Sequence, residues 1–192
     1  MDTQPEELTE TATTSRRGLL TSLIAGASVA AVPFLAGNAS AAAGSTPSTT
    51  TPPNRDEADN PVLNVLLARE RAMVLAYRAA VDNSMSEEEK NVLLYFHENH
   101  IAYVDALHGF LGPKAIEASP GAAAAPSGSF ANIATTLIAA ERETVNAHTA
   151  ALAQISGISA ASLIASIIPV EARHITVLSI ASGQPVSAAL TN

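Results

Sequence analysis

The sequence contains no cysteine and no tryptophan, and aromatic residues make up only 4% of its 192 residues. The lack of cysteine excludes disulfide bonds, cysteine-ligated zinc and iron–sulfur clusters, so any metal site must use histidine and carboxylate side chains. The scarcity of aromatic residues, in a chain that is 47% hydrophobic, disfavours a sheet protein, because strands are rich in aromatic and β-branched residues. An alanine-rich, all-α domain is therefore expected.

Basic residues are also few. The chain carries 10 Lys and Arg against 18 Asp and Glu, which gives a net charge of −8. Without a basic patch, a nucleic-acid partner is not expected. The acidic balance mildly favours metal cations as partners.

The N-terminal segment is expected to be an export signal. Thr14-Ser15-Arg16-Arg17-Gly18-Leu19-Leu20 resembles the twin-arginine consensus, an apolar run follows to about Ala36, and small residues from Ala39 to Ala43 offer cleavage sites. The alternative is an uncleaved membrane anchor, but Pro33 and the many Ala and Gly residues make this run a poor spanning helix. We expect residues 1–43 to be cleaved, with no stable membrane insertion afterwards, and the mature protein to lie in the periplasm, the cell envelope or outside the cell.

The rest of the chain divides into a linker, a bundle and a tail. Residues 44–60 are rich in Ser, Thr and Pro and then charged, which predicts a flexible linker. Apolar residues at spacings of three and four predict four helices within residues 61–183, with 184–192 as a C-terminal tail. The helices are expected over about residues 62–82, from a Ser86 cap to 111, 130–155 and 160–181.

Three further features concern the shape of this bundle. The long connection over residues 112–128 is typical of a crossover between the two halves of a helical bundle, although an ordinary surface loop has the same composition. Asn60 is expected to cap the first helix ahead of Pro61. Pro169 lies inside the fourth helix and should kink it.

Ionisable residues interrupt the apolar stripe of every predicted helix. The first and third helices each bring one Glu, and the second and fourth each bring a pair three residues apart, so the two halves of the bundle are alike. Burying so many ionisable groups without partners would be costly, and buried charges are normally paired or hold a metal. The candidate metal ligands are Glu70, His97, His100, Glu141, Glu171 and His174.

Carboxylates and imidazoles in this layout are typical of di-iron and di-manganese centres in four-helix bundles. Carboxylates can bridge two cations, while imidazoles complete each coordination shell and leave positions open for water or dioxygen. We therefore expect iron or manganese as the cofactor, at a dinuclear site or a mononuclear remnant of one.

Three stretches of the predicted helices carry a resemblance to a known family: Leu63-Asn64-x-x-Leu67-x-x-Glu70, His100-x-x-Tyr103-x-x-x-Leu107, and Val170-Glu171-Ala172-Arg173-His174. Through them the chain resembles the ferritin-like domain of exported bacterial proteins, a group related to plant desiccation-associated proteins. The resemblance covers about residues 60–183, and it implies a ferritin-like four-helix up-down bundle with a long crossover. Its wider superfamily includes iron-oxidising and oxygen-reducing enzymes.

One position departs from the family pattern. The second helix should read Glu-x-x-His, but His97 stands where the Glu is expected before His100. At about 100° per residue, Glu98 lies roughly 160° around the helix from His100, so it cannot substitute unless a π-bulge shifts the register. Three carboxylates then offset only part of the charge of two divalent ions. We expect a weaker ferroxidase than usual, or one metal held tightly.

Three readings of function remain open on these residues. The first is an exported protein with oxidoreductase chemistry toward dioxygen or peroxide, and the second is a non-catalytic envelope-binding or stress-protection bundle. The third is a metal-free bundle that binds a partner, and the oligomeric state, a homodimer included, stays open. Near the site, His148 is expected to support a ligand or bond within the core. Tyr77 and Tyr103 are expected to pack in the core, with the alternative that a phenol bonds a ligand carboxylate.

Overall fold

A computed structural model describes residues 56–82, 86–117 and 126–184 of the chain. Four long helices account for most of these residues: α2 (Asn60–Val81), α3 (Glu87–Leu111), α4 (Phe130–Leu152) and α5 (Ile158–Ser182). Two short 3₁₀ turns, η2 (Glu57–Asp59) and η3 (Gly112–Lys114), flank the first pair. The described residues contain no strand, which confirms the all-α prediction.

The helix ends follow from local capping. Ser86 and Glu89 form the expected capping box at the start of α3, Ser129 caps α4, and Gly183 ends α5 in the left-handed conformation that favours glycine. Helix α2 starts at Asn60, two residues before the predicted start at about residue 62. Asn60 is helical rather than a cap, because η2 begins ahead of it with Asp56 as its cap. The predicted linker over 44–60 is therefore structured from residue 56 onward.

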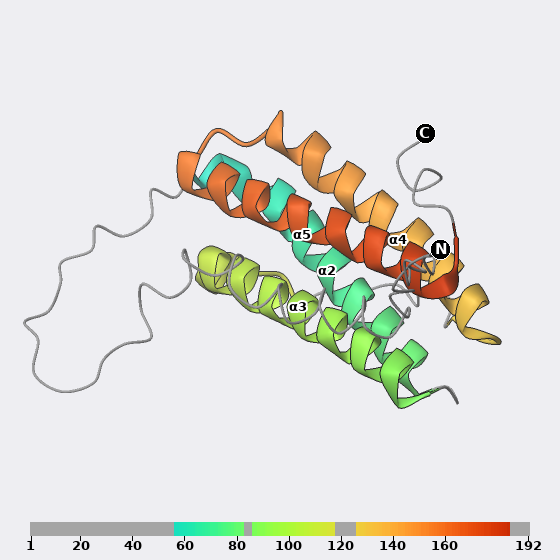
Figure 1. Cartoon of the computed structure of the whole chain (residues 1–192). Helices are drawn as coiled ribbons and strands as arrows, with labels where there is room; N and C mark the ends of the chain where they lie inside the picture. The colour runs from blue at the N-terminus through green and yellow to red at the C-terminus, as the bar shows by residue number, and fades with distance from the viewer. Residues whose placement is uncertain (1–55, 83–85, 118–125, 185–192) are drawn as a thin grey trace, which may run out of the picture.

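The helices form two antiparallel pairs, α2 with α3 and α4 with α5, which pack into one bundle (Figure 1). Asp59, just before α2, accepts hydrogen bonds from the backbone N–H groups of Ser156 and Gly157 at 2.8 Å each, so the start of α2 lies beside the α4–α5 turn. Helices α3 and α4 run in the same direction (Figure 1). The connection between them must therefore span the bundle, as expected for a crossover.

A polar layer divides the core into two apolar clusters. One cluster includes Tyr77, Phe96 and Leu137, and the other includes Leu67 and Leu107. In each helix, the buried ionisable residues fall in sequence between a segment of one cluster and a segment of the other. All four helices thus bring their ionisable residues to one level of the bundle.

Helix α5 is long and apolar enough to cross a membrane by length and composition, and it is the one such helix within the described residues. More than half of its most apolar stretch is buried inside the bundle, which accounts for its apolar character in a core helix. The helix continues through Pro169 without interruption. The predicted signal, residues 1–43, the linker up to residue 55 and most of the tail lie outside the described residues.

Candidate metal centre

Six ionisable side chains meet in the polar layer, and each of them is fully buried. Glu70 comes from α2, His100 from α3, Glu141 and His148 from α4, and Glu171 and His174 from α5. Each projects from the inward stripe of its helix, at the spacings of three and seven residues that return a side chain to the same face. The four helices therefore enclose a cluster of three carboxylates and three imidazoles.

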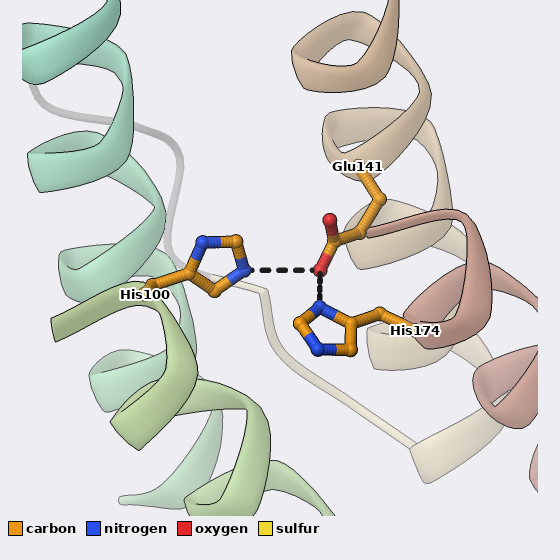
Figure 2. A group of neighbouring side chains, drawn as sticks. All are labelled: His100, Glu141 and His174. Atoms are coloured by element: carbon orange, nitrogen blue, oxygen red, sulfur yellow. Dashed lines mark hydrogen bonds and ion pairs between the residues drawn. The ribbon is translucent and has the colours of Figure 1, made fainter. Parts of the chain in front are cut away.

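Glu141 lies at one end of this cluster. Its Oε1 is 3.1 Å from His100 Nε2 and 3.1 Å from His174 Nδ1, and Figure 2 shows both rings turned toward that one oxygen. The hydroxyl of Tyr77 also donates to Oε1, at 2.5 Å. Burial alone would raise the pKa of Glu141, but the two imidazoles hold that pKa well below its usual range. Glu141 is therefore ionised.

His100 connects the two ends of the cluster. Its Nδ1 is 2.7 Å from Glu70 Oε2, while its Nε2 faces Glu141. Burial lowers the pKa of His100, but the carboxylates of Glu141 and Glu70 outweigh burial and raise the pKa to about 10. Without a metal, the ring is thus an imidazolium that both carboxylates stabilise.

Glu171 and His148 form the other end. Glu171 Oε2 lies 3.2 Å from His148 Nδ1, and His148 Nε2 lies 3.3 Å from Glu70 Oε1. His148 Nδ1 donates its hydrogen bond to the backbone carbonyl of Thr144, at 3.0 Å. Burial raises the pKa of Glu171 to about 8, with the Glu70 and Glu141 carboxylates adding to the effect and His148 opposing it.

His174 also has a partner at the edge of the cluster. Its Nε2 lies 3.0 Å from the side-chain amide of Asn99, on α3, while Nδ1 faces Glu141. Burial lowers the pKa of His174, and the neighbouring charge of His100 lowers it further against the opposing effect of Glu141. Asn99 thereby fixes the ring orientation and leaves Nδ1 directed into the cluster.

The cluster has unused ligand atoms, and these suit a cation. Four of the six carboxylate oxygens accept no hydrogen bond, although all are buried: Glu70 Oε1, Glu141 Oε2, and Glu171 Oε1 and Oε2. Buried carboxylate oxygens without donors are costly, and a metal ion removes that cost. Two groups of three ligand atoms lie within 4.8 Å of one another, namely His100 with Glu141 and His174, and Glu70 with His100 and Glu171. The residues present therefore fit a metal.

The structure brings five of the six predicted ligands together and leaves His97 aside. Neither group of potential ligands contains His97, whose Nδ1 is buried without a hydrogen-bond partner and lies 3.8 Å from Glu98 Oε1. His97 is one turn from His100 on the same stripe, but only His100 belongs to a group of potential ligands. Helix α3 therefore brings one residue, instead of the predicted two, into these groups.

Two residues of the cluster are not among the predicted ligands. His148, two turns beyond Glu141 on the same stripe, is expected from the sequence to support a ligand or bond within the core, and it lies against Glu70 and Glu171. Asn99 had no such signal, since it falls between the stripe positions of α3. Tyr77, expected to pack in the core, does so and also bonds a candidate ligand.

One comparison with known proteins gives a match. The model of a family described as ferritin-like domain matches residues 58–184, a range that takes in all four helices and every residue of the cluster. No curated protein and no solved structure matches the chain.

Proposed function

The chain belongs to the ferritin-like domain family, and on that premise we propose that it binds iron or manganese at a dinuclear centre and uses it in oxidoreductase chemistry toward dioxygen or peroxide. The observation that carries this proposal is the set of four buried carboxylate oxygens without hydrogen bonds. A core that merely tolerated ionisable residues would pair those oxygens with donors.

The donor types favour these two metals. Oxygen and nitrogen ligands, without any sulfur, suit manganese and iron better than copper(I) or structural zinc. Glu70, His100, Glu141, Glu171 and His174 are the proposed ligands, with one histidine to each ion. Three carboxylates leave two divalent ions with one uncompensated positive charge, which a hydroxide can neutralise. This deficit supports a site that stabilises the oxidised metals less well than four carboxylates would.

When bound, such a metal pair supplies electrons to dioxygen or peroxide and open coordination positions for them. The protein's own residues fix the geometry of the centre. Tyr77 holds one oxygen of Glu141 in place and leaves the other free. Asn99 orients the His174 ring, and the two apolar clusters exclude water from both sides of the layer.

Oxygen consumption tests the proposal. The chain would be loaded with iron(II) under anaerobic conditions and then mixed with dioxygen or hydrogen peroxide. We expect consumption of one of these oxidants together with oxidation of the bound iron. If metal binds but neither oxidant is consumed, the proposed oxidoreductase activity is contradicted. That result would favour the second reading, a non-catalytic envelope-binding or stress-protection bundle.

We also propose that the protein is exported through the twin-arginine route and is related to desiccation-associated proteins of its family. The pair Arg16-Arg17 ahead of the apolar run supports export. Replacing both with Lys should retain the precursor inside the cell, where its N-terminal residues would remain on the protein. Export of that variant at the original level would remove the support for this route.

A further inference from the structure

His148 is bound to the α4 backbone in a way that fixes its ring. Its Nδ1 lies 3.0 Å from the carbonyl oxygen of Thr144, one turn earlier, and the side chain is fully buried. A backbone carbonyl can only accept a hydrogen bond, so Nδ1 must carry the proton. Nε2 is then the nitrogen that can bind a metal, as in histidines that bind a metal through one nitrogen and anchor the other.

That Nε2 atom has no hydrogen-bond partner. It lies 3.3 Å from Glu70 Oε1, which also lacks one, and both atoms are buried. A nitrogen lone pair and a carboxylate oxygen at this distance repel each other unless a positive charge, a proton or a metal ion, is shared between them. The structure therefore contains an unpartnered nitrogen that points at an unpartnered oxygen of a candidate ligand.

The arrangement of the other ligands leaves a place for this nitrogen. The two groups of potential ligands both use His100, which faces Glu70 with one ring nitrogen and Glu141 with the other. An imidazole normally binds one metal ion through one nitrogen. Neither group contains His97 or His148. His148 Nε2 lies 3.3 Å from Glu70 Oε1, an atom of a residue in the second group, whereas His97 Nδ1 lies 3.8 Å from Glu98, which belongs to neither group.

We propose that His148 Nε2 is a further metal ligand, which binds the ion at the Glu70 and Glu171 end of the centre. Helix α4 thereby supplies the ligand that α3 lacks. The inference rests on the proposed function, because it requires a metal in the layer.

Metal titration of three variants tests the inference, with manganese(II) and cobalt(II) as probes. Bound metal would be counted by elemental analysis after gel filtration, and the visible absorption of cobalt(II) would report the ligand set. His148→Gln keeps an amide that can donate to Glu70 but ligates poorly. In His148→Glu the new carboxylate can bind a metal. If His148 instead serves only to position Glu70, this carboxylate would repel Glu70 and the variant would not restore metal binding. His97→Gln is the matched control on the neighbouring helix.

We expect two equivalents of metal in the unaltered chain and in His97→Gln. His148→Gln should bind the second equivalent at least about tenfold more weakly and change the cobalt(II) spectrum. His148→Glu should restore binding of the second equivalent. This variant keeps the inference testable if His148→Gln does not fold.

Two equivalents bound normally by His148→Gln, or a folded His148→Glu variant that binds only one, would overturn this inference and leave the proposed function intact. Loss of the second equivalent in His97→Gln would overturn it as well. An unaltered chain that binds no metal would overturn both the proposed function and the inference.

Discussion

The hydrogen bonds of the three buried glutamates are distributed unequally. Glu141 Oε1 has three partners, Tyr77, His100 and His174, whereas neither oxygen of Glu171 has a hydrogen bond. Glu141 is thus stabilised without a metal, while Glu171 is held in the core at a cost. In the metal-free protein, Glu141 should therefore stabilise the fold, and Glu171 should destabilise it.

The phenol of Tyr77 should contribute measurably to stability. Its hydroxyl donates to an ionised, buried carboxylate, so Tyr77→Phe should lower the free energy of unfolding of the metal-free protein by about 1.5–3 kcal/mol. Chemical denaturation measures this change. Tyr103→Phe is the matched control, because the buried Tyr103 hydroxyl has no hydrogen-bond partner and its removal should be neutral or stabilising. Equal losses of unfolding free energy in the two variants would contradict a stabilising hydrogen bond from Tyr77 to Glu141.

The metal-free protein should lose stability as the pH rises from about 5 to 10. His100, with a folded pKa of about 10, binds a proton that the unfolded chain releases near 6.5, so its contribution disappears as the pH rises through 10. Glu171, with a folded pKa of about 8, keeps a proton that the unfolded chain releases near 4.5, so it lowers stability progressively between these pH values, and the loss is complete above pH 8. His100 and Glu171 therefore both lower the stability of the fold as the pH rises.

Thermal denaturation across this range checks the pH dependence. His100→Gln should flatten the decline above pH 8, because the replaced side chain does not titrate. A metal-free protein whose melting temperature stays constant between pH 6 and 9 would show that these groups do not titrate as the buried cluster requires.

At the scale of the helices, Asp59 joins the first helix to the last. Its buried carboxylate accepts from the N–H groups of Ser156 and Gly157, at the start of α5, where the helix dipole also favours a negative charge. This contact closes the bundle between segments that are far apart in the sequence. It also sets the level at which Glu70 faces the residues of α4 and α5.

Removing this carboxylate should loosen the bundle. Asp59→Ala breaks two charge-assisted hydrogen bonds and should cost about 3 kcal/mol, while Asp59→Asn, which keeps one acceptor oxygen, should cost less. Asp56→Ala is the control, because Asp56 caps only the exposed turn η2 and should cost about 1 kcal/mol or less. Similar losses at the two positions, measured by chemical denaturation, would argue against this account of Asp59.

The sequence predicts the helices well and the site in part. Apolar periodicity identifies four helices and the positions of Glu70, Glu141 and Glu171, because a buried Glu stands out in an apolar stripe. Periodicity cannot separate His97 from His100, which lie on the same stripe about 60° apart. That choice depends on which side chains of the neighbouring helices face them. The contact of His148 with Glu70 depends on the axial offset between α2 and α4, which no local pattern contains.

At the scale of the whole molecule, the polar layer separates two apolar clusters that would otherwise form one continuous core. Such a layer reduces the stability of the metal-free fold, because unpaired carboxylates replace apolar contacts. A bound metal reverses that cost, since its ligands are assembled only in the folded state.

Added metal should therefore stabilise the folded protein. Manganese(II) at about 100 times its dissociation constant should add about 2.7 kcal/mol to the free energy of unfolding for each ion bound, and a chelator should remove that gain. The double variant Glu171→Ala/His174→Ala should not respond to either addition. A melting temperature that manganese and iron leave unchanged in the unaltered protein would favour the third reading, a metal-free bundle that binds a partner.

The most direct test of a dinuclear centre is elemental analysis of the protein purified from its native host, beside the Glu171→Ala/His174→Ala variant. We predict two equivalents of iron or manganese per chain, and their loss in the variant. A protein that carries no metal, or that carries the same metal in both forms, would contradict that prediction.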